Sequence, residues 1–438
     1  MSIETITLLM FVSLAVLLAL GVPLAFALGG LAIIIGFMLM GDTIFSWAVQ
    51  RTWFLMGLFS FIAIPLFVFM ANMLRFSGIA DDLYEAIYLW MGPLRGGLAV
   101  ATVLACTILA AMIGTAGGGV VIMGLIALPF MLRHNYDKGI ACGSIVAGGS
   151  LGVLIPPSIL FILYALFAAE SVGKLFMGGV FPGLILAGLF SFYIIIRAWL
   201  QPEAAPALSS EERTMPLRQK LGRLKSLILP VLLIIAVMGS IFAGVATPSE
   251  AAGVGAMGAI LSAAVRRRLT WHNLKEAVYA SIKSVAMLMW IAFAAYTFVG
   301  VYLFAGGGDF IKESLLGMGL GPWGILIVIQ IMLIVMGMFL DWVGILFLVV
   351  PMVLPILLDL GFNALWFGVL FNLNMQISYL SPPFGYSLFY LKGVSPPEIS
   401  MTDIYRSAFP FMILQLIGLA LVMLFPQIAL WLPSVMIK

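Results

Sequence analysis

Two pairs of adjacent prolines lie inside apolar segments of this sequence, and they are the residues best suited to create a ligand site. Pro156-Pro157 follows Leu-Gly-Val-Leu-Ile at residues 151–155, and Pro382-Pro383 stands within Tyr-Leu-Ser-Pro-Pro-Phe-Gly at residues 379–385. Each proline lacks a backbone donor and clashes with the preceding turn, so both segments are predicted to break as helices. In lipid, the carbonyl oxygens freed at a break need protein, water or an ion as partner, and oxygen ligands suit a hard cation such as Na⁺. The two breaks therefore predict ion or solute binding.

A glycine-rich run, Gly-Thr-Ala-Gly-Gly-Gly at residues 114–119, divides the apolar segment 97–131 into halves too short to span a membrane comfortably. This pattern predicts a re-entrant hairpin with its tip at residues 114–119. Glycines at such a tip serve either close helix packing or contact with an ion or substrate, and both interpretations stand here. Half-helix N-termini near Gly117 and Ser158 would favour a substrate carboxylate through their dipoles.

Segment 322–358 repeats the hairpin pattern, with an expected tip near residues 338–344 that contains Asp341. A carboxylate inside a membrane is costly and usually functional, so Asp341 is a candidate substrate-binding residue. The alternative is a carboxylate that water at the tip solvates. Glu250, in Thr-Pro-Ser-Glu at residues 247–250, is expected instead to support the start of a helix at Ala251.

The sequence does not indicate an enzyme, because no His, Cys or carboxylate cluster lies at membrane depth. Cys106 and Cys142 fall in apolar segments, where burial is favoured over a disulfide or a metal site. His134 and His272 lie in polar loops far apart in the sequence. No cofactor is expected beyond a coupling ion, and the net charge of +3 reflects loop charge rather than nucleic-acid binding.

The elements that position these residues are predicted to be membrane helices. Hydrophobic residues make up 63% of the 438 positions and charged residues 9%, and apolar segments of spanning length recur from end to end. Residues 6–40 form either one kinked helix or two helices around Gly21-Val22-Pro23. Trp47, Arg51 and Trp53 are typical of an interfacial anchor. Residues 80–90 and 306–320 are expected to lie in the membrane interface.

An internal repeat links the two breaks at a constant offset in residue number (382 − 156 = 226). Laying residues 118–164 on 344–390 without a gap gives these identical pairs: Pro129 and Pro355, Pro156 and Pro382, Pro157 and Pro383, Gly118 and Gly344, Tyr164 and Tyr390. Basic residues in the connector 132–138, in the loop 213–225 and at 266–268 mark the cytoplasmic side, whereas the connector 359–363 has none. The repeats are therefore predicted to be inverted, as in secondary transporters.

The fold class predicted is an all-α polytopic membrane protein with inverted repeats, two re-entrant hairpins and two proline-broken helices. Four regions follow: N-terminal scaffold spans and an interfacial helix at 1–96, a first transport repeat at 97–200, a cytoplasmic loop with scaffold spans at 201–321, and a second, inverted transport repeat at 322–438.

The sequence resembles a known family, the large membrane subunit of tripartite ATP-independent periplasmic (TRAP) transporters. The matching stretches follow one another over nearly the whole chain: Ala63-Ile64-Pro65-Leu66-Phe67, residues 152–158, Ser171-Val172-Gly173-Lys174-Leu175-Phe176, Phe181-Pro182-Gly183, residues 247–251 and Leu380-Ser381-Pro382-Pro383-Phe384-Gly385. The resemblance implies a Na⁺-driven, elevator-type carrier in the bacterial inner membrane. It also implies two partners, a small membrane subunit and a periplasmic binding protein that delivers a carboxylate-bearing solute.

The resemblance further implies two Na⁺ sites formed largely by backbone oxygens. The residues of the first are Gly114, Thr115, Gly152, Ile155 and Pro157; those of the second are Gly337, Ser378, Ser381 and Phe384. The family's first tip often reads Ser-Gly-Ser-Ser, whereas this chain has Ile113-Gly114-Thr115-Ala116. Two hydroxyls are therefore missing from the first site, which leaves coordination by the backbone.

The alternative function is a membrane channel for small anions. Continuous polar stripes that line a pore would support a channel, and the sequence has none.

Overall fold

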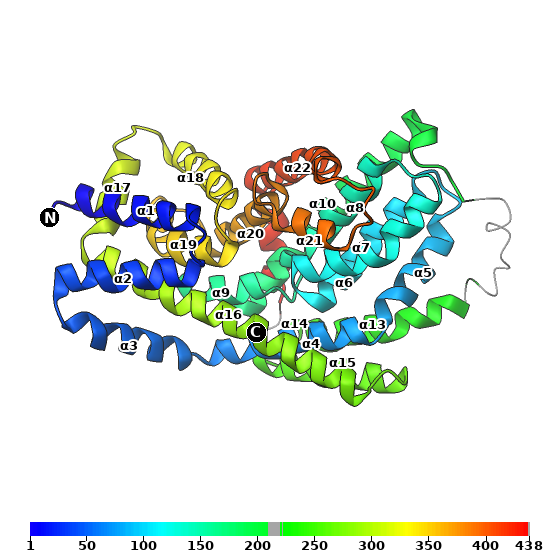
Figure 1. The fold of residues 1–438 in the computed structure, drawn as a ribbon, viewed down its shortest axis with the longest axis horizontal. Coiled ribbons are helices and arrows are strands. Elements are labelled where there is room, and N and C mark those ends of the chain that lie inside the picture. Colours follow the sequence, from blue (N-terminus) through cyan, green and yellow to red (C-terminus); the bar gives the residue numbers. More distant parts are fainter. Residues whose placement is uncertain (209–219, 221, 437–438) are drawn as a thin grey trace.

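The computed structural model describes residues 1–208, 220 and 222–436 of the chain, and these residues form helices and connecting turns without a strand (Figure 1). The predicted all-helical class is therefore confirmed. The basic loop expected at 213–225 lies partly outside the described residues. Five helices of the described part are long and apolar enough to cross a membrane, or six if α4 and α5, bent by 66°, are counted as one span.

The first half of the chain contains α1 to α10. Their bounds are α1 Ile3–Ala19, α2 Leu24–Met40, α3 Thr43–Met56, α4 Ala63–Phe76, α5 Ile79–Met91, α6 Gly97–Ile113, α7 Ala116–Arg133, α8 Lys138–Ser150, α9 Ile159–Ala168 and α10 Val172–Leu200, with short 3₁₀ turns η1 Phe59–Ile62, η2 Leu151–Val153 and η3 Pro202–Ala204. Residues 6–40 are thus two helices, because Gly21 takes a positive φ of 81° in the turn that precedes Pro23.

The second half begins with the 3₁₀ turn η4 Leu224–Leu227. It continues with α13 Ile228–Ile234, the π-helical turn η5 Ile235–Gly239, α14 Ser240–Phe242, α15 Pro248–Val265, α16 Trp271–Phe304, α17 Gly307–Leu316, α18 Pro322–Gly337, α19 Trp342–Asp359, α20 Ala364–Leu380, α21 Tyr386–Val394, α22 Met401–Leu424 and α23 Gln427–Ser434. As expected, Glu250 caps the start of α15, where Thr247 and Glu250 form a capping box.

The offset between the two proline pairs recurs in the helix boundaries. Helix α7 begins at Ala116 and α19 at Trp342 (342 − 116 = 226), and α8 and α20 begin at Lys138 and Ala364 (364 − 138 = 226). The correspondence extends to the N-terminal helices, since α2 and α15 begin at Leu24 and Pro248 (248 − 24 = 224). The agreement in helix boundaries therefore extends beyond the segments that contain the proline pairs.

Several pairs of helices that pack together in the structure have counterpart pairs, at the constant offset, that also pack together. Helix α2 packs on α16. By the offset in residue number, α15 is the counterpart of α2, and α4 is the counterpart of the second half of α16. Helix α15 packs on α4, so the counterparts also pack together. The pairs α8–α22 and α10–α20, and likewise α7–α21 and α9–α19, also pack together. Each of these pairs of contacting helices thus has a matching pair made of their counterparts in the other half.

The two proline-broken crossings form the centre of the molecule (Figure 1). All 17 residues of α20 are buried, and so is every residue of the first broken crossing over 140–165. In contrast, Pro382, Pro383 and Phe384 at the second break are exposed. Both breaks therefore contain two adjacent prolines, but the first break is buried and the second is exposed.

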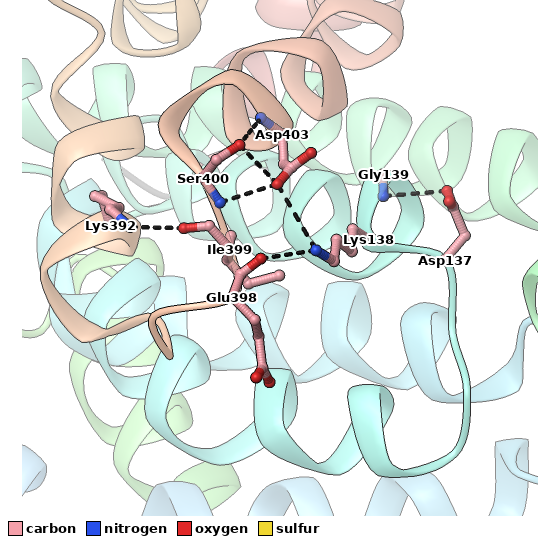
Figure 2. Close-up of polar contacts among 8 residues, drawn as sticks. All are labelled: Asp137, Lys138, Gly139, Lys392, Glu398, Ile399, Ser400 and Asp403. Carbon is pink, nitrogen blue, oxygen red and sulfur yellow. Dashed lines mark hydrogen bonds and ion pairs between the residues drawn. The ribbon is translucent and has the colours of Figure 1, made fainter.

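Polar contacts join the beginning of α8 to the connector that follows α21 (Figure 2). The Nζ of Lys138 donates to the carbonyl oxygen of Glu398 at 2.7 Å and lies 3.9 Å from the Asp403 carboxylate. The Nζ of Lys392 donates to the carbonyl of Ile399 at 2.6 Å. The contacts of Lys138 join the two halves at the start of α8, whereas the Lys392 bond lies within the connector after α21.

Candidate functional site

The first hairpin tip is two residues long and lies directly on the first proline break. Gly114 ends α6 with a positive φ of 66°, and Thr115 is the extended residue that precedes α7. A Cβ at Gly114 would lie 2.3 Å from the carbonyl oxygen of Pro157. Only glycine fits there, both because of its φ and because of this approach.

A second contact joins the same tip to the start of the break. A Cβ at Gly152 would lie 2.7 Å from the carbonyl oxygen of Thr115. The carbonyl oxygen of Pro157 thus lies against Gly114 and that of Thr115 against Gly152, and the buried side chain of Ile155 contacts Gly183 of α10. The groups available as ligands at this place are carbonyl oxygens, which suit a hard cation.

The expected tip of residues 114–119 is longer than the observed one, because α7 already begins at Ala116. Gly119 packs on the backbone of α8, because a Cβ at Gly119 would lie 3.3 Å from the Cα of Gly149. Gly117 faces the ring of Tyr390. The glycines of this run therefore have different neighbours: Gly114 lies against the carbonyl oxygen of Pro157, and Gly119 packs against α8.

The second hairpin meets the second broken crossing through Gly337 and Ser378. A Cβ at Gly337 would lie 1.8 Å from the Oγ and 2.3 Å from the Cβ of Ser378. The hydroxyls of Ser378 and Ser381 donate to the carbonyls of Asn374 at 3.3 Å and Ile377 at 2.8 Å. Phe384 is 52% exposed.

Of the three candidate substrate residues, Gly117 lies against the ring of Tyr390. Asp341 caps α19 by accepting from the Val343 N–H at 3.3 Å. Ser158 is fully buried, and its hydroxyl donates to the carbonyl of Val153, so its side chain is occupied within the break.

Comparison with known proteins identifies the family. A model of the family described as "Tripartite ATP-independent periplasmic transporter, DctM component" matches residues 11–428. The chain belongs to this family. It is 31% identical to the C4-dicarboxylate TRAP transporter large permease protein DctM of Vibrio cholerae, over 98% of this chain and 97% of that protein.

Relatives of this DctM-family chain differ in the solutes that their names give. The ectoine/5-hydroxyectoine TRAP transporter large permease protein UehC of Ruegeria pomeroyi is 32% identical, over 96% of this chain and 97% of that protein. The crystal structure of the Alcanivorax borkumensis YdaH transporter, described as having an unusual topology, is similar with a TM-score of 0.61. It is 14% identical and covers 94% of this chain and 97% of that chain, so this likeness concerns the fold.

Sequence reasoning missed a group of buried amides on α20 of the DctM-family chain. Asn374 donates to the side-chain oxygen of Gln330 at 2.8 Å and to its carbonyl at 2.9 Å, which joins α20 to α18. Gln376 is fully buried, and neither polar atom of its amide has a partner among the described residues. The signal was present as polar residues spaced four apart, Asn372 with Gln376 and Asn374 with Ser378, in an apolar helix.

Proposed function

We propose that this chain is the transport subunit of a secondary carrier that moves an organic anion with a carboxylate inward, coupled to Na⁺. The observation that carries the proposal is the seating of each hairpin on a broken crossing, Gly114 on Pro157 and Gly337 on Ser378. Such breaks at matching positions of two halves are the usual location of ion and substrate sites in secondary transporters.

Na⁺ coupling is supported by the donor set at the two tips. In the first site, Thr115 and Pro157 present carbonyl oxygens beside glycines that have no side chain to cover them. In the second site, Ser378 and Ser381 add hydroxyl oxygens beside Gly337. Oxygen ligands of this kind suit Na⁺, which in this mechanism is a transported ion rather than a resident cofactor.

The carboxylate of the solute would bind between the tips, near Gly117 at the start of α7. Helix α7 begins at Ala116 and presents unpaired N–H groups and a positive dipole end at this place. Such an end favours an anionic group. Tyr390, which faces Gly117, and Asp341 would then contact the uncharged or polar remainder of the solute.

The movement that we propose is of the elevator type. Helices α6 to α10 and α18 to α22 would move as one transport unit, held together by contacts such as Lys138 with Glu398, against a scaffold that includes α2, α4, α15 and α16. The matching helix pairs of the two halves support an inverted repeat, because two-fold related halves with opposite entry sides can exchange their conformations.

The family description supports two partners, since it calls the system tripartite, and the relatives' names call their chain the large permease. We propose a small membrane subunit and a periplasmic binding protein, both at the bacterial inner membrane. The names of relatives give C4-dicarboxylates and ectoine as solutes, so both are tested as solutes of this chain.

The test is uptake of labelled C4-dicarboxylates and ectoine into proteoliposomes that hold this chain, its small subunit and its binding protein. Uptake that requires an inward Na⁺ gradient and the binding protein is the expected result. A Ser381→Ala variant should raise the Na⁺ concentration for half-maximal uptake. Flux without a gradient and without the binding protein would reject the carrier and indicate a channel.

A further inference from the structure

Tyr405 on α22 is hydrogen-bonded to the second proline break. Its hydroxyl donates to the carbonyl oxygen of Pro383 at 3.0 Å. Among the described residues, this is the only hydrogen bond that joins the segment 381–385 to a helix other than α20 and α21. The N–H and the hydroxyl of Ser381 donate back into α20, and the carbonyl of Gly385 accepts from α21. Tyr405 is therefore the side chain that ties this break to the helix beside it.

The position of Tyr405 has an equivalent in the first half that also contacts a break. Tyr405 corresponds to Gly179 of α10 (405 − 179 = 226). A Cβ at Gly179 would lie 2.4 Å from the carbonyl oxygen of Leu154, which stands between η2 and the first proline pair. In both halves, the residue at this position thus lies against a carbonyl oxygen of the break in its own half.

The two contacts differ in kind, as the two breaks differ in burial. Leu154 is fully buried, and close backbone packing on Gly179 encloses its carbonyl. Pro383 is exposed, as are its two neighbours, so packing encloses little of the second break. A hydrogen bond is directional and needs no enclosure, so the hydroxyl of Tyr405 can hold the Pro383 carbonyl where packing does not.

The beginning of α22, which carries Tyr405, is itself held in place. Ser400 and Asp403 form a capping box at this helix start, and the Nζ of Lys138 lies 3.9 Å from the Asp403 carboxylate (Figure 2). Tyr405 stands in the second turn of the helix, directly after this anchored end. The bond therefore restrains the break against a fixed helix.

We propose that Tyr405 is a positioning residue for the second Na⁺ site. Pro383 lies between Ser381 and Phe384, two of the residues expected to bind Na⁺ there, so the bond restrains the backbone that carries these ligands. A preorganised site binds its ion more tightly, because less of the binding energy is used to order the ligands. This role rests on the Na⁺ coupling proposed above, and Tyr405 itself does not contact the ion.

The test is the Na⁺ dependence of uptake in proteoliposomes that hold the complete three-subunit system. Tyr405→Phe keeps the ring and loses the hydroxyl, and the Na⁺ concentration for half-maximal uptake should rise about two- to tenfold. The solute concentration for half-maximal uptake at saturating Na⁺ should remain unchanged. The matched control is Tyr302→Phe on α16, which loses a hydroxyl that bonds to the Oγ1 of Thr7 at 2.9 Å and should keep the Na⁺ dependence of the wild type.

Double variants assign the effect to one of the two ion sites. Ser381→Ala already weakens the second site, so adding Tyr405→Phe to it should raise the Na⁺ requirement less than in the wild type. Added to Gly152→Ala at the first site, Tyr405→Phe should keep its full effect. Equal effects in both backgrounds would reject the assignment of Tyr405 to the second site.

Two further results would overturn the role of Tyr405, and they are distinct from a failure of Na⁺ coupling. Unchanged Na⁺ dependence in Tyr405→Phe, where the wild type requires Na⁺, would reject the positioning role and leave the proposed function intact. A lower melting temperature with equal increases in the Na⁺ and solute concentrations for half-maximal uptake would assign the hydroxyl to general stability. Uptake by the wild type without any need for Na⁺ would reject the proposed coupling, and the role of Tyr405 with it.

Discussion

Gly152 lies directly against the backbone of Thr115, so that a Cβ at Gly152 would approach the Thr115 carbonyl oxygen to 2.7 Å. This relationship joins the tip of the first hairpin to the start of the first proline break. Because the atom approached is backbone, a larger residue cannot be accommodated by turning a side chain. The first ion site that we propose would thus depend on the missing side chain of Gly152.

We expect Gly152→Ala to push the tip away from the break. Overpacking of this kind costs about 1–3 kcal/mol, and a displacement of the carbonyls should raise the Na⁺ concentration for half-maximal uptake at least several-fold. The matched control is Gly188→Ala on α10, where a Cβ would meet nothing within 4 Å. Equal Na⁺ dependence of both variants in proteoliposomes would show that the Thr115–Gly152 contact does not form the ion site.

The contact between Gly337 and Ser378 can be tested by a compensating pair. Gly337→Ala places a methyl group on the Oγ and Cβ of Ser378 and should lower the melting temperature. Adding Ser378→Gly removes both atoms and should recover much of the lost stability, whereas Ser378→Ala keeps the Cβ and should not. If both double variants melt alike, the two residues are not in contact as described.

Asp341 combines a helix cap with a negative charge, and two substitutions separate these roles. Asp341→Asn keeps the acceptor for the Val343 N–H, whereas Asp341→Ala removes it and should destabilise the protein by about 0.5–2 kcal/mol. If the charge serves transport, Asp341→Asn should retain the melting temperature and lose most uptake. Full uptake by the Asn variant would leave Asp341 with the capping role alone.

The two breaks differ in exposure at equivalent positions, and this difference predicts their labelling. Phe384 is 52% exposed, whereas Ser158, its equivalent in the first half (384 − 158 = 226), is fully buried. Phe384→Cys should therefore react with a water-soluble maleimide much faster than Ser158→Cys. The native Cys106 and Cys142 are buried, so the unmodified chain serves as the control for background labelling.

Elevator movement would exchange the conformations of the two halves, so conditions that favour the opposite state should alter this labelling. Slower labelling of Phe384→Cys, together with faster labelling of Ser158→Cys, is the expected pattern. Constant rates at both positions under Na⁺, solute and binding protein would argue against an exchange of the halves.

The sequence by itself was sufficient to predict that the helices of this protein lie in a membrane and where two of them break. Apolar composition requires hydrogen-bonded helices in lipid, and the pairs Pro156-Pro157 and Pro382-Pro383 cannot continue a helix in any tertiary context. The offset between the halves followed from the prolines alone, and it recurs in the boundaries of α7 and α19. These features are local, so they do not depend on which helices become neighbours.

The tertiary structure alone decided which helix faces meet. Lipid-facing and buried positions are both apolar in a membrane helix, so the pattern of hydrophobic residues does not distinguish the exposed Trp199 from the buried Phe190 on α10. The seating of Gly337 on Ser378, the placement of Tyr390 against Gly117 and the slot that Gly300 leaves for Arg51 each join residues far apart in the chain. Such contacts depend on the packing of whole helices, and no short stretch of sequence specifies them.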